Sequence, residues 1–308
     1  MSEEFKAQGG TELLLGYLRA QVDPLHFQNI NLINNSCNPA ALRKDQINVV
    51  WLHHSYDQQA VHNMGVKAYV DQIDYFVFVS DWQFEKFRYI HSVPESRCIV
   101  IKNAIPPMQP RRKPDKLKLI YTSTPWRGLD VLLDAFALLN RDDVELDVYS
   151  STLIYGSNYH KQNHAEYSAL FDRAAQQKGV NYKAFAPNVD VREALQNAHI
   201  FAYPSIWEET SCLAALEAAM AGCSLVTTNF GALYETLAQW PRYVGYDSNK
   251  RLLASNFARA LDHAIDNFWT PENQAQLTEQ VRYFQRFWTW DTRGKEWEAF
   301  LTLARQAK

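Results

Sequence analysis

Two glutamates eight positions apart, Glu209 and Glu217, are the residues of this sequence whose types and spacing best suit chemistry. An apolar run at 199–203 precedes them and another at 224–228 follows, and each is short enough to be a buried strand. Glu209 would then lie in the loop at the carboxyl end of a strand, which is where open α/β sheets bind ligands. We therefore predict a ligand site at this loop, with Glu209 in it.

The residues between the two predicted strands favour a helix that carries Glu217. Thr210 or Ser211 can cap its amino end, and Gly222 can end it as the C′ residue. Glu217 shares one helical stripe with three apolar residues, Leu213, Leu216 and Met220. A carboxylate among core-facing residues is costly without a partner, so we expect one. The spacing alone is equally compatible with Glu217 on the exposed rim of a surface helix.

Arg127 follows a predicted strand at 117–122 and precedes a predicted helix with the apolar stripe Leu129, Leu132, Leu133 and Phe136. The amino end of a helix attracts anions through its free amides and its dipole. An arginine there adds a planar fork of donors that can hold a phosphate group at two points. The pattern indicates a phosphate-binding turn, although these residues taken alone fit an exposed surface arginine better.

Two further turns have residue types that suit a polar ligand. Gly9 and Gly10 precede a predicted helix, and paired glycines let the backbone approach a phosphate or a sugar closely. His53 and His54 follow a predicted strand at 47–52, where an imidazole could donate to a sugar hydroxyl. Because neighbours along a strand face opposite ways, we expect at most one of the two histidines in a cleft.

Several classes of site are not expected. No Gly-x-Gly-x-x-Gly, no Gly-x-x-x-x-Gly-Lys-Ser/Thr and no Asp-x-Asp occurs, which argues against dinucleotide, P-loop and metal–diphosphate sites. His160 and His164 are four residues apart, but without an acidic partner we predict no metal site there. The four cysteines show no metal spacing, and so few in a long chain indicate free thiols in a reducing compartment.

The charge and hydropathy of the chain limit its partners. The net charge of −3 gives no long-range attraction to nucleic acid or anionic lipid. No run of 18 apolar residues occurs, and the acidic first residues are unlike a signal peptide. We therefore expect a cytoplasmic protein without a nucleic-acid partner or a transmembrane segment, while peripheral contact with a membrane stays compatible with the sequence.

The order of the predicted elements indicates two α/β domains, for which 308 residues give room. Strand-like and helix-like runs alternate, which is typical of parallel sheets with helices on both faces. The segment 103–114 has four prolines and three basic residues, so we place a linker there. Further strands are predicted at 27–32, 75–79, 98–102, 145–150, 180–185 and 242–245, and further helices at 11–21, 82–89, 254–267, 271–285 and 291–307.

The segment 204–222 resembles the signature of the retaining nucleotide-sugar glycosyltransferases of family 4, which have the GT-B fold. That signature is Pro-Ser-x-x-Glu-Gly-Phe-Gly-x-x-x-x-Glu-Ala-Met-Ala-x-Gly, and this sequence keeps Pro204, Ser205, Glu209, Glu217, Ala218 and Gly222. One extra residue before Glu209 makes Glu208 a rival for the first acidic position, but the distance from Glu209 to Glu217 is the stricter match. Thr210-Ser211-Cys212 replaces Gly-Phe-Gly, where the family holds its donor with backbone amides.

The resemblance implies a role for each candidate residue. Arg127 would bind the leaving diphosphate, Glu209 the hydroxyls of the donor sugar, and His53, with His54 as the alternative, would lie near that sugar; these three are the expected catalytic residues. Glu217 would accept hydrogen bonds from the ribose. The remaining donor-binding residues would be Gly9, Gly10, Ser211, Cys212, Leu213 and, against the base, Phe185. The family is thought to react without a protein nucleophile, and we expect neither a metal nor another cofactor.

The implied fold is α/β, with two Rossmann-like doubly wound domains that face a cleft. We expect an acceptor-side domain at 1–105, a linker at 106–115, a nucleotide-sugar-binding domain at 116–288 and a helix at 289–308 that packs back on the first domain. Members of the family usually have a strand before the glycine turn, but residues 1–8 show no strand pattern. The first domain is therefore expected to be reduced, either naturally or by truncation.

The implied reaction is the transfer of a sugar from a nucleotide diphosphate sugar to the hydroxyl of a carbohydrate or lipid-linked acceptor, with retention of configuration, in the synthesis of a glycan or glycoconjugate. Two alternatives stay open. One is another GT-B enzyme, such as a nucleotide-sugar epimerase or a phosphorylase. The other is a protein that binds a nucleotide or a carbohydrate without turnover, because the glycines of the donor loop are lost.

Overall fold

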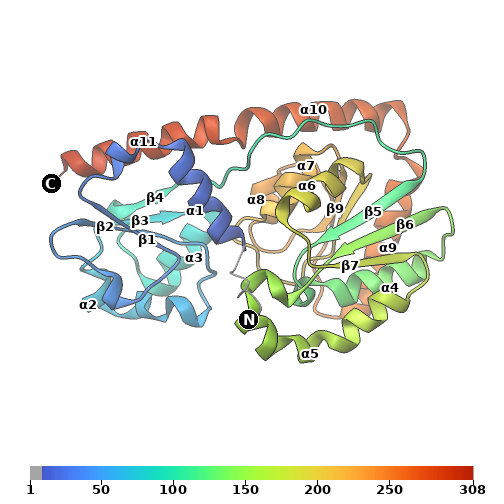
Figure 1. The fold of residues 1–308 in the computed structure, drawn as a ribbon, viewed down its shortest axis with the longest axis horizontal. Coiled ribbons are helices and arrows are strands. Elements are labelled where there is room, and N and C mark those ends of the chain that lie inside the picture. Colours follow the sequence, from blue (N-terminus) through green and yellow to red (C-terminus); the bar gives the residue numbers. More distant parts are fainter. Residues whose placement is uncertain (1–8, 308) are drawn as a thin grey trace, which may run out of the picture.

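The computed structural model describes residues 9–307, which form two parallel β-sheets with helices around them (Figure 1). The first sheet has the strand order β1-β2-β3-β4, and all its neighbouring strands are parallel. Its strands are β1 (Ile30–Asn34), β2 (Ile47–Trp51), β3 (Tyr75–Phe78) and β4 (Cys98–Val100). The predicted lack of a first strand concerns residues 1–8, which lie outside the described residues.

The second sheet contains a topological switch point. Its parallel strands have the order β10-β9-β8-β5-β6-β7, so the chain adds β6 and β7 on one side of β5 and then returns to add β8 on the other. Ligands bind at the carboxyl ends of strands where the order reverses in this way. The strands are β5 (Leu117–Thr122), β6 (Val144–Tyr149), β7 (Val180–Ala184), β8 (Ile200–Tyr203), β9 (Ser224–Thr228) and β10 (Arg242–Val244).

Helices connect the strands and cover the sheets. Figure 1 shows α6 and α7 on one side of the second sheet and α4, α5 and α9 on the other. Two parallel sheets with helices between their strands confirm the predicted α/β class. The helices are α1 (Gly10–Gln21), α2 (Lys67–Val70), α3 (Asp81–His91), α4 (Leu129–Leu139), α5 (Ser157–Gln176), α6 (Asn188–Asn197), α7 (Leu213–Met220), α8 (Leu233–Leu237), α9 (Lys250–Asp266), α10 (Pro271–Phe287) and α11 (Trp290–Gln306).

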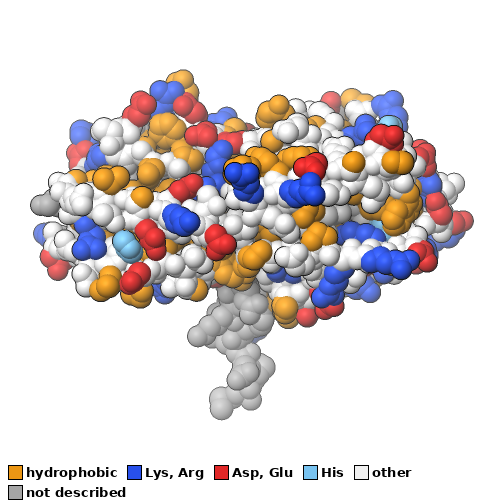
Figure 2. Space-filling model, turned by 90° about the horizontal axis from the view of Figure 1, so that it is seen from above, with side chains coloured by type: hydrophobic (Ala, Val, Ile, Leu, Met, Phe, Trp, Pro, Cys, Tyr) orange, Lys and Arg blue, Asp and Glu red, His pale blue; other side chains and the backbone are white. Residues whose placement is uncertain are grey.

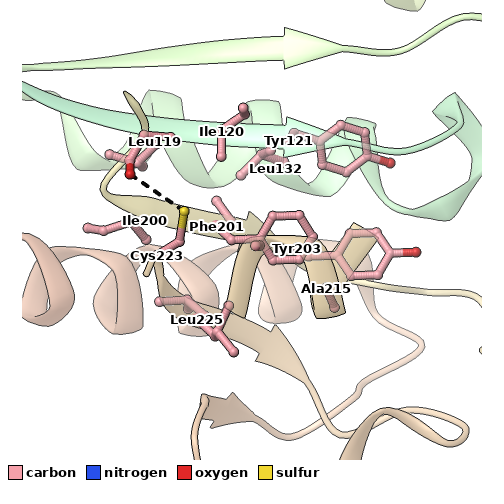
Figure 3. Close-up of a cluster of buried hydrophobic side chains, with 14 of the residues drawn as sticks. Leu119, Ile120, Tyr121, Leu132, Ile200, Phe201, Tyr203, Ala215, Cys223 and Leu225 are labelled. Atoms are coloured by element: carbon pink, nitrogen blue, oxygen red, sulfur yellow. Dashed lines mark hydrogen bonds between the residues drawn. The ribbon is translucent and has the colours of Figure 1, made fainter. Parts of the chain in front are cut away.

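The core of the second domain lies on both sides of β5 and β8. Every residue of β8 and β9 is buried, as expected for central strands of a sheet that helices cover on both faces. Figure 3 shows Tyr121 of β5 and Tyr203 of β8 with their hydroxyl groups at the same end of the sheet. That end is the carboxyl end of the strands, so two buried hydroxyl groups lie at the end of the sheet where the switch point is.

The first strand begins three residues later than predicted. We predicted a strand at 27–32, whereas β1 is Ile30–Asn34. The preceding residues, Pro24–Phe27, form a 3-10 turn, and Asn29 has a φ of 62°. That left-handed conformation interrupts extended backbone, so the strand can start only after it.

The chain crosses between the domains at two adjacent places. The amide of Ile105 donates to the carbonyl oxygen of Trp288 at 3.0 Å, and Ile105 forms a parallel bridge with Thr289. Beyond this point α11 packs against α1, and the ring of its Trp297 lies 4.9 Å from that of Trp51 in β2. Figure 1 shows α10 and α11 running one after the other along both domains. The last helix therefore belongs to the core of the first domain.

Charged side chains of both signs share one face of the molecule, and the cysteines are unpaired. Figure 2 shows basic and acidic side chains interspersed over the face that carries α10 and α11. None of the helices within residues 9–307 is long and apolar enough to cross a membrane. The four cysteines are free thiols, as predicted.

Candidate functional site

A cavity of about 840 Å³ opens between the carboxyl ends of the two sheets. Both domains contribute to its walls, through the start of α1, the end of β2 and the loops after β5, β6, β7 and β8. All ten residues predicted for the site line it: Gly9, Gly10, His53, Arg127, Phe185, Glu209, Ser211, Cys212, Leu213 and Glu217. Glu208, the rival of Glu209, is not among its lining residues. The structure thus brings together residues from five separate segments of the sequence.

Arg127 and Glu209 form an ion pair at the switch point. Nη1 of Arg127 lies 2.9 Å from Oε1 and 3.3 Å from Oε2 of Glu209. The hydroxyl of Tyr203 donates to the same Oε1. Only 5% of the Glu209 side chain and 25% of the Arg127 side chain are exposed. The pair is possible because Arg127 follows β5 and Glu209 follows β8, and these two strands are neighbours.

The guanidinium of Arg127 stays charged and keeps capacity for an anion. Burial lowers the pKa of Arg127, but Glu209 and the nearby hydroxyls of Tyr155 and Tyr203 raise that pKa to well above its usual range. Its Nε has no hydrogen-bond partner among residues 9–307. A buried donor without a partner is costly, so a ligand oxygen at this position would stabilise the site.

A glycine explains how the two loops come so close. Gly128 has a φ of 117°, and a Cβ there would lie 2.2 Å from the carbonyl oxygen of Pro204. The amide of Ile206 donates to the carbonyl oxygen of Arg127 at 3.4 Å. Any larger residue at 128 would push the loop after β5 away from the loop after β8, so the Arg-Gly order positions Arg127 against Glu209.

Glu217 is buried and has the partner that its burial requires. Nη1 of Arg192 lies 3.0 Å from its Oε1, and Nδ2 of Asn188 lies 3.1 Å from the same oxygen. Burial raises the pKa of Glu217, and Arg192 opposes that rise. Nη2 of Arg192 also donates to the carbonyl oxygen of Pro106 at 2.9 Å, which fixes the arginine to the linker. The interpretation of Glu217 as an exposed rim residue is therefore wrong.

The start of α7 differs from the prediction. The N-cap is Cys212, and neither Thr210 nor Ser211 caps the helix. The Thr210 hydroxyl donates instead to the carbonyl oxygen of His53 at 2.8 Å, across the cleft. Within the described residues the Ser211 hydroxyl has no partner. The predicted end of the helix is confirmed, because Gly222 follows it with a φ of 76°.

The amino ends of α1 and α7 meet at the cavity. A Cβ on Gly10 would lie 3.0 Å from Cδ1 of Leu213, so the glycine permits the close approach of the two helix starts. Cys212 and Leu213 line the cavity, whereas Leu129 at the start of α4 is fully buried and does not. The helix start in the cavity wall is therefore that of α7 rather than that of α4, the helix after Arg127, where we expected amides for an anion.

Both histidines of the first domain line the cavity, contrary to the prediction that at most one would. The reason is that β2 ends at Trp51, so the two residues belong to a loop and do not alternate. Both of their amides donate to Oδ1 of Asn35 at 3.0 Å. Burial lowers the pKa of His53 to about 3, and its Nε2 lies 3.2 Å from Oδ1 of Asn34. His53 is therefore neutral at physiological pH.

Four aromatic side chains in the cavity wall were not predicted for the site. They come from the turn after β5 and from the segment after β6, and they are Trp126, Tyr155, Tyr159 and Tyr167. The rings of Trp126 and Tyr155 are stacked, with centroids 5.9 Å apart. Two features of the sequence could have revealed these aromatic residues: Trp126 directly precedes Arg127, and Tyr155 and Tyr159 are spaced by one helical turn. At the far edge of the sheet, Phe185 follows β7 and lines the cavity as expected.

No metal site is found in the part of the chain that the structure describes: it contains no group of three or more His, Cys, Asp or Glu side chains arranged to hold an ion. His160 and His164 pack against each other with ring centroids 4.5 Å apart. Nδ1 of His160 forms a hydrogen bond with the Thr152 hydroxyl at 2.7 Å. This pair therefore has a local structural role at the start of α5.

The comparisons with known proteins agree with this architecture. The family model of group 1 glycosyl transferases matches residues 108–282, which is more than half of the chain. Similar crystal structures include a glycosyltransferase from Rickettsia africae, with a TM-score of 0.72 and 11% identity over 98% of this chain and 84% of that chain. Another is Anabaena Alr3699/HepE in complex with UDP and glucose, with a TM-score of 0.68 and 15% identity over 97% of this chain and 85% of that chain.

A third similar structure is the pneumococcal O-GlcNAc transferase GtfA in complex with UDP and GlcNAc. It has a TM-score of 0.68 and 11% identity over 96% of this chain and 60% of that chain. At these identities the likeness shows the fold, GT-B, and no more. No curated protein matches the sequence.

Proposed function

Since this chain belongs to the group 1 glycosyl transferases, we propose that it transfers a sugar from a nucleotide diphosphate sugar to an acceptor hydroxyl, with retention of configuration and without a metal ion. The observation that carries the proposal is the switch point, where Arg127 and Glu209 meet in the cavity that Glu217 also lines. One basic group and two carboxylates suit the three parts of such a donor: the diphosphate, the sugar and the ribose.

Arg127 would stabilise the diphosphate as it leaves, because negative charge develops there in the transition state. In the protein without ligand, Glu209 balances the charge of Arg127. A bound diphosphate would take up the unused donor at Nε and the amides at the start of α7. The site would thus exchange part of one ion pair for a stronger set of charge-assisted hydrogen bonds.

Glu209 would bind the sugar. Because the Tyr203 hydroxyl holds its Oε1, the carboxylate has a fixed orientation and can offer Oε2 to the sugar hydroxyls. His53 is neutral, and its single ring N–H, on Nε2, donates to Oδ1 of Asn34, so Nδ1 would accept a hydrogen bond from a sugar hydroxyl. The ring cannot serve as a cationic acid near neutral pH. Glu217 would accept hydrogen bonds from the ribose, as carboxylates do in dinucleotide-binding folds.

Retention would follow from attack on the face that the diphosphate leaves. The bond from the acceptor oxygen to the anomeric carbon forms while the bond from that carbon to the phosphate oxygen breaks. A phosphate oxygen takes the proton of the acceptor hydroxyl, so no protein nucleophile is required. The residues of this chain would hold the donor and neutralise its charge rather than bond to it.

UDP is the first nucleotide to test, because HepE and GtfA are both found with UDP in their crystal structures. A thermal-shift screen of UDP, GDP, ADP and one sugar derivative of each decides whether the cavity binds such donors. A ligand at 100 times its Kd stabilises the native state by about 2.7 kcal/mol, which raises the melting temperature measurably. A screen in which none of the six compounds moves the melting temperature would contradict the proposed function.

The same screen tests independence from metal ions. The absence of an Asp-x-Asp motif and the place of Arg127 in the cavity that the start of α7 also lines favour a diphosphate site made of protein groups alone. We expect the shift produced by the best nucleoside diphosphate to be unchanged in excess EDTA. A shift that disappears in EDTA and returns with Mg²⁺ or Mn²⁺ would overturn this expectation.

A further inference from the structure

A carboxylate of the second domain caps a helix of the first domain. Oε1 of Glu235, in α8, accepts a hydrogen bond from the amide of Asp81 at 2.9 Å, and Oε2 accepts one from the amide of Trp82 at 2.9 Å. These are the first two amides of α3, which have no partner within the helix. Nζ of Lys102, which follows β4, lies 3.0 Å from Oε1 of Glu235. Both oxygens of Glu235 are thus engaged by the other domain.

The first domain is built to receive this carboxylate. The Ser80 hydroxyl accepts the amide of Gln83, so the local cap of α3 leaves only the amides at positions 81 and 82 for Glu235. A negative charge is favourable at the amino end of a helix. Burial by itself raises the pKa of Glu235, but the two amides and Lys102 lower it to below its usual range. With 19% of its side chain exposed, Glu235 is charged, largely buried and fully paired.

The segment that carries Glu235 is also bound to Glu209. Gly231 forms a parallel bridge with Glu209, and the amide of Ala232 donates to the carbonyl oxygen of Glu209 at 2.7 Å. Gly231 has a φ of 63°, and a Cβ there would lie 2.5 Å from the amide nitrogen of Glu209. One short segment therefore joins the backbone of Glu209 to the contact between the domains.

We propose that Glu235 is a positioning residue that holds the two domains in the arrangement in which His53 and Gly10 face Glu209 and Arg127. The contribution to sugar transfer rests on the proposed function, whereas the contribution to domain arrangement does not. Arg127, Glu217 and the α7 amides all belong to the second domain. Loss of Glu235 therefore affects transfer much more than it affects the binding of a nucleoside diphosphate.

The arrangement of the domains is tested by small-angle X-ray scattering of the protein without ligand. The variants are Glu235→Ala and Glu235→Gln, with Glu145→Gln as a matched control that breaks an ion pair with Lys116 inside the second domain. We expect a larger radius of gyration for Glu235→Ala, a smaller change for Glu235→Gln and none for the control. A scattering curve of Glu235→Ala that superimposes on that of the wild type overturns the proposal.

Lys102→Met provides a second route to the same test, because it removes the cation on the first domain and leaves Glu235 in place. If Glu235→Ala does not fold, as judged by circular dichroism, Lys102→Met decides the outcome by the same measurement. An increased radius of gyration supports the proposal, and an unchanged one contradicts it.

The effect on the reaction is read from UDP binding and from UDP release during UDP-glucose hydrolysis. We expect the UDP affinity of Glu235→Ala to stay within twofold of the wild type, while its turnover falls about tenfold, the order expected for loss of charge-assisted hydrogen bonds. Glu235→Gln should recover part of the turnover.

Equal losses in affinity and turnover would contradict a positioning role. A wild-type protein that neither binds UDP nor hydrolyses UDP-glucose counts against the proposed function, and the scattering result still decides the role of Glu235.

Discussion

Replacement of Arg127 by alanine is expected to remove most of the affinity for a nucleoside diphosphate and to destabilise the fold. Hydrogen bonds to a charged group contribute roughly 1.5–3 kcal/mol, which is about a tenfold to 150-fold loss in affinity. The same change leaves Glu209, only 5% exposed, without its counter-ion. Breaking a buried pair in this way costs about 3–5 kcal/mol of stability. Calorimetric titration with UDP and urea denaturation measure the two effects.

Two further variants separate the loss of UDP affinity from the loss of stability. Arg127→Lys should recover only part of the affinity, because lysine keeps the charge but loses the planar fork. The double variant Arg127→Ala/Glu209→Gln should regain stability, because the buried group is then neutral, but it should not regain UDP affinity. If folded Arg127→Ala binds UDP as tightly as the wild type does, then Arg127 does not bind the diphosphate.

The two glutamates should respond differently to replacement by glutamine, which keeps their size and removes their charge. Glu217→Gln should weaken UDP and UDP-glucose alike, by about tenfold, because Glu217 is assigned to the nucleoside half of both. Glu209→Gln should leave UDP binding nearly intact, reduce turnover strongly and relax the selectivity among donor sugars. The measurement is the pair of affinities, for UDP and for UDP-glucose, in each variant.

Equal shifts of both affinities in both variants would show that the division between sugar and nucleoside is wrong. If neither glutamine variant changes either affinity in a folded protein, the donor does not bind at these carboxylates. Because glutamine keeps the size of the side chain, a change in affinity in either variant can be assigned to the lost charge.

The strands of the second sheet could be predicted almost residue by residue, because turn residues separate them and the central strands β8 and β9 are fully buried. Their order in space could not be predicted, because no local pattern tells that β5 and β8 are neighbours. The sequence therefore predicts separate roles for Arg127 and Glu209, whereas the structure joins them in one ion pair. Their shared location, however, follows from the rule that loops after strands meet at one edge of a parallel sheet.

The need for a partner at Glu217 could be predicted, but its identity could not. Helical spacing left two places for the carboxylate, among core-facing residues or on an exposed rim, and a partner is required only in the first. Arg192 and Asn188 supply it from α6, a different helix, so no local spacing points to them. Tertiary contacts also decide the start of α7: Thr210 has the residue type of a cap, but its hydroxyl bonds to the first domain instead.

The resemblance of segment 204–222 to a glycosyltransferase signature led to the correct fold. The two parallel-sheet domains and the similar crystal structures confirm GT-B, and the match to group 1 confirms the family at that level. The choice of Glu209 over Glu208 agrees with the cavity, which Glu209 alone of the two lines. Retention of configuration and independence from metal ions remain proposals, which rest on the resemblance and on the chemistry of Arg127.

Saturation-transfer difference NMR tests most directly whether this cavity holds an intact sugar donor. The wild-type protein is mixed with UDP-glucose, GDP-mannose and ADP-glucose in turn, and the signals of base, ribose and sugar protons are recorded. We predict that at least one donor receives saturation on all three parts, that excess of its nucleoside diphosphate abolishes the signals, and that Glu217→Gln weakens them. The assignment of the cavity as a nucleotide-sugar site would be contradicted if none of the three donors received saturation. It would also be contradicted if the signals in Arg127→Ala and Glu217→Gln were the same as in the wild-type protein.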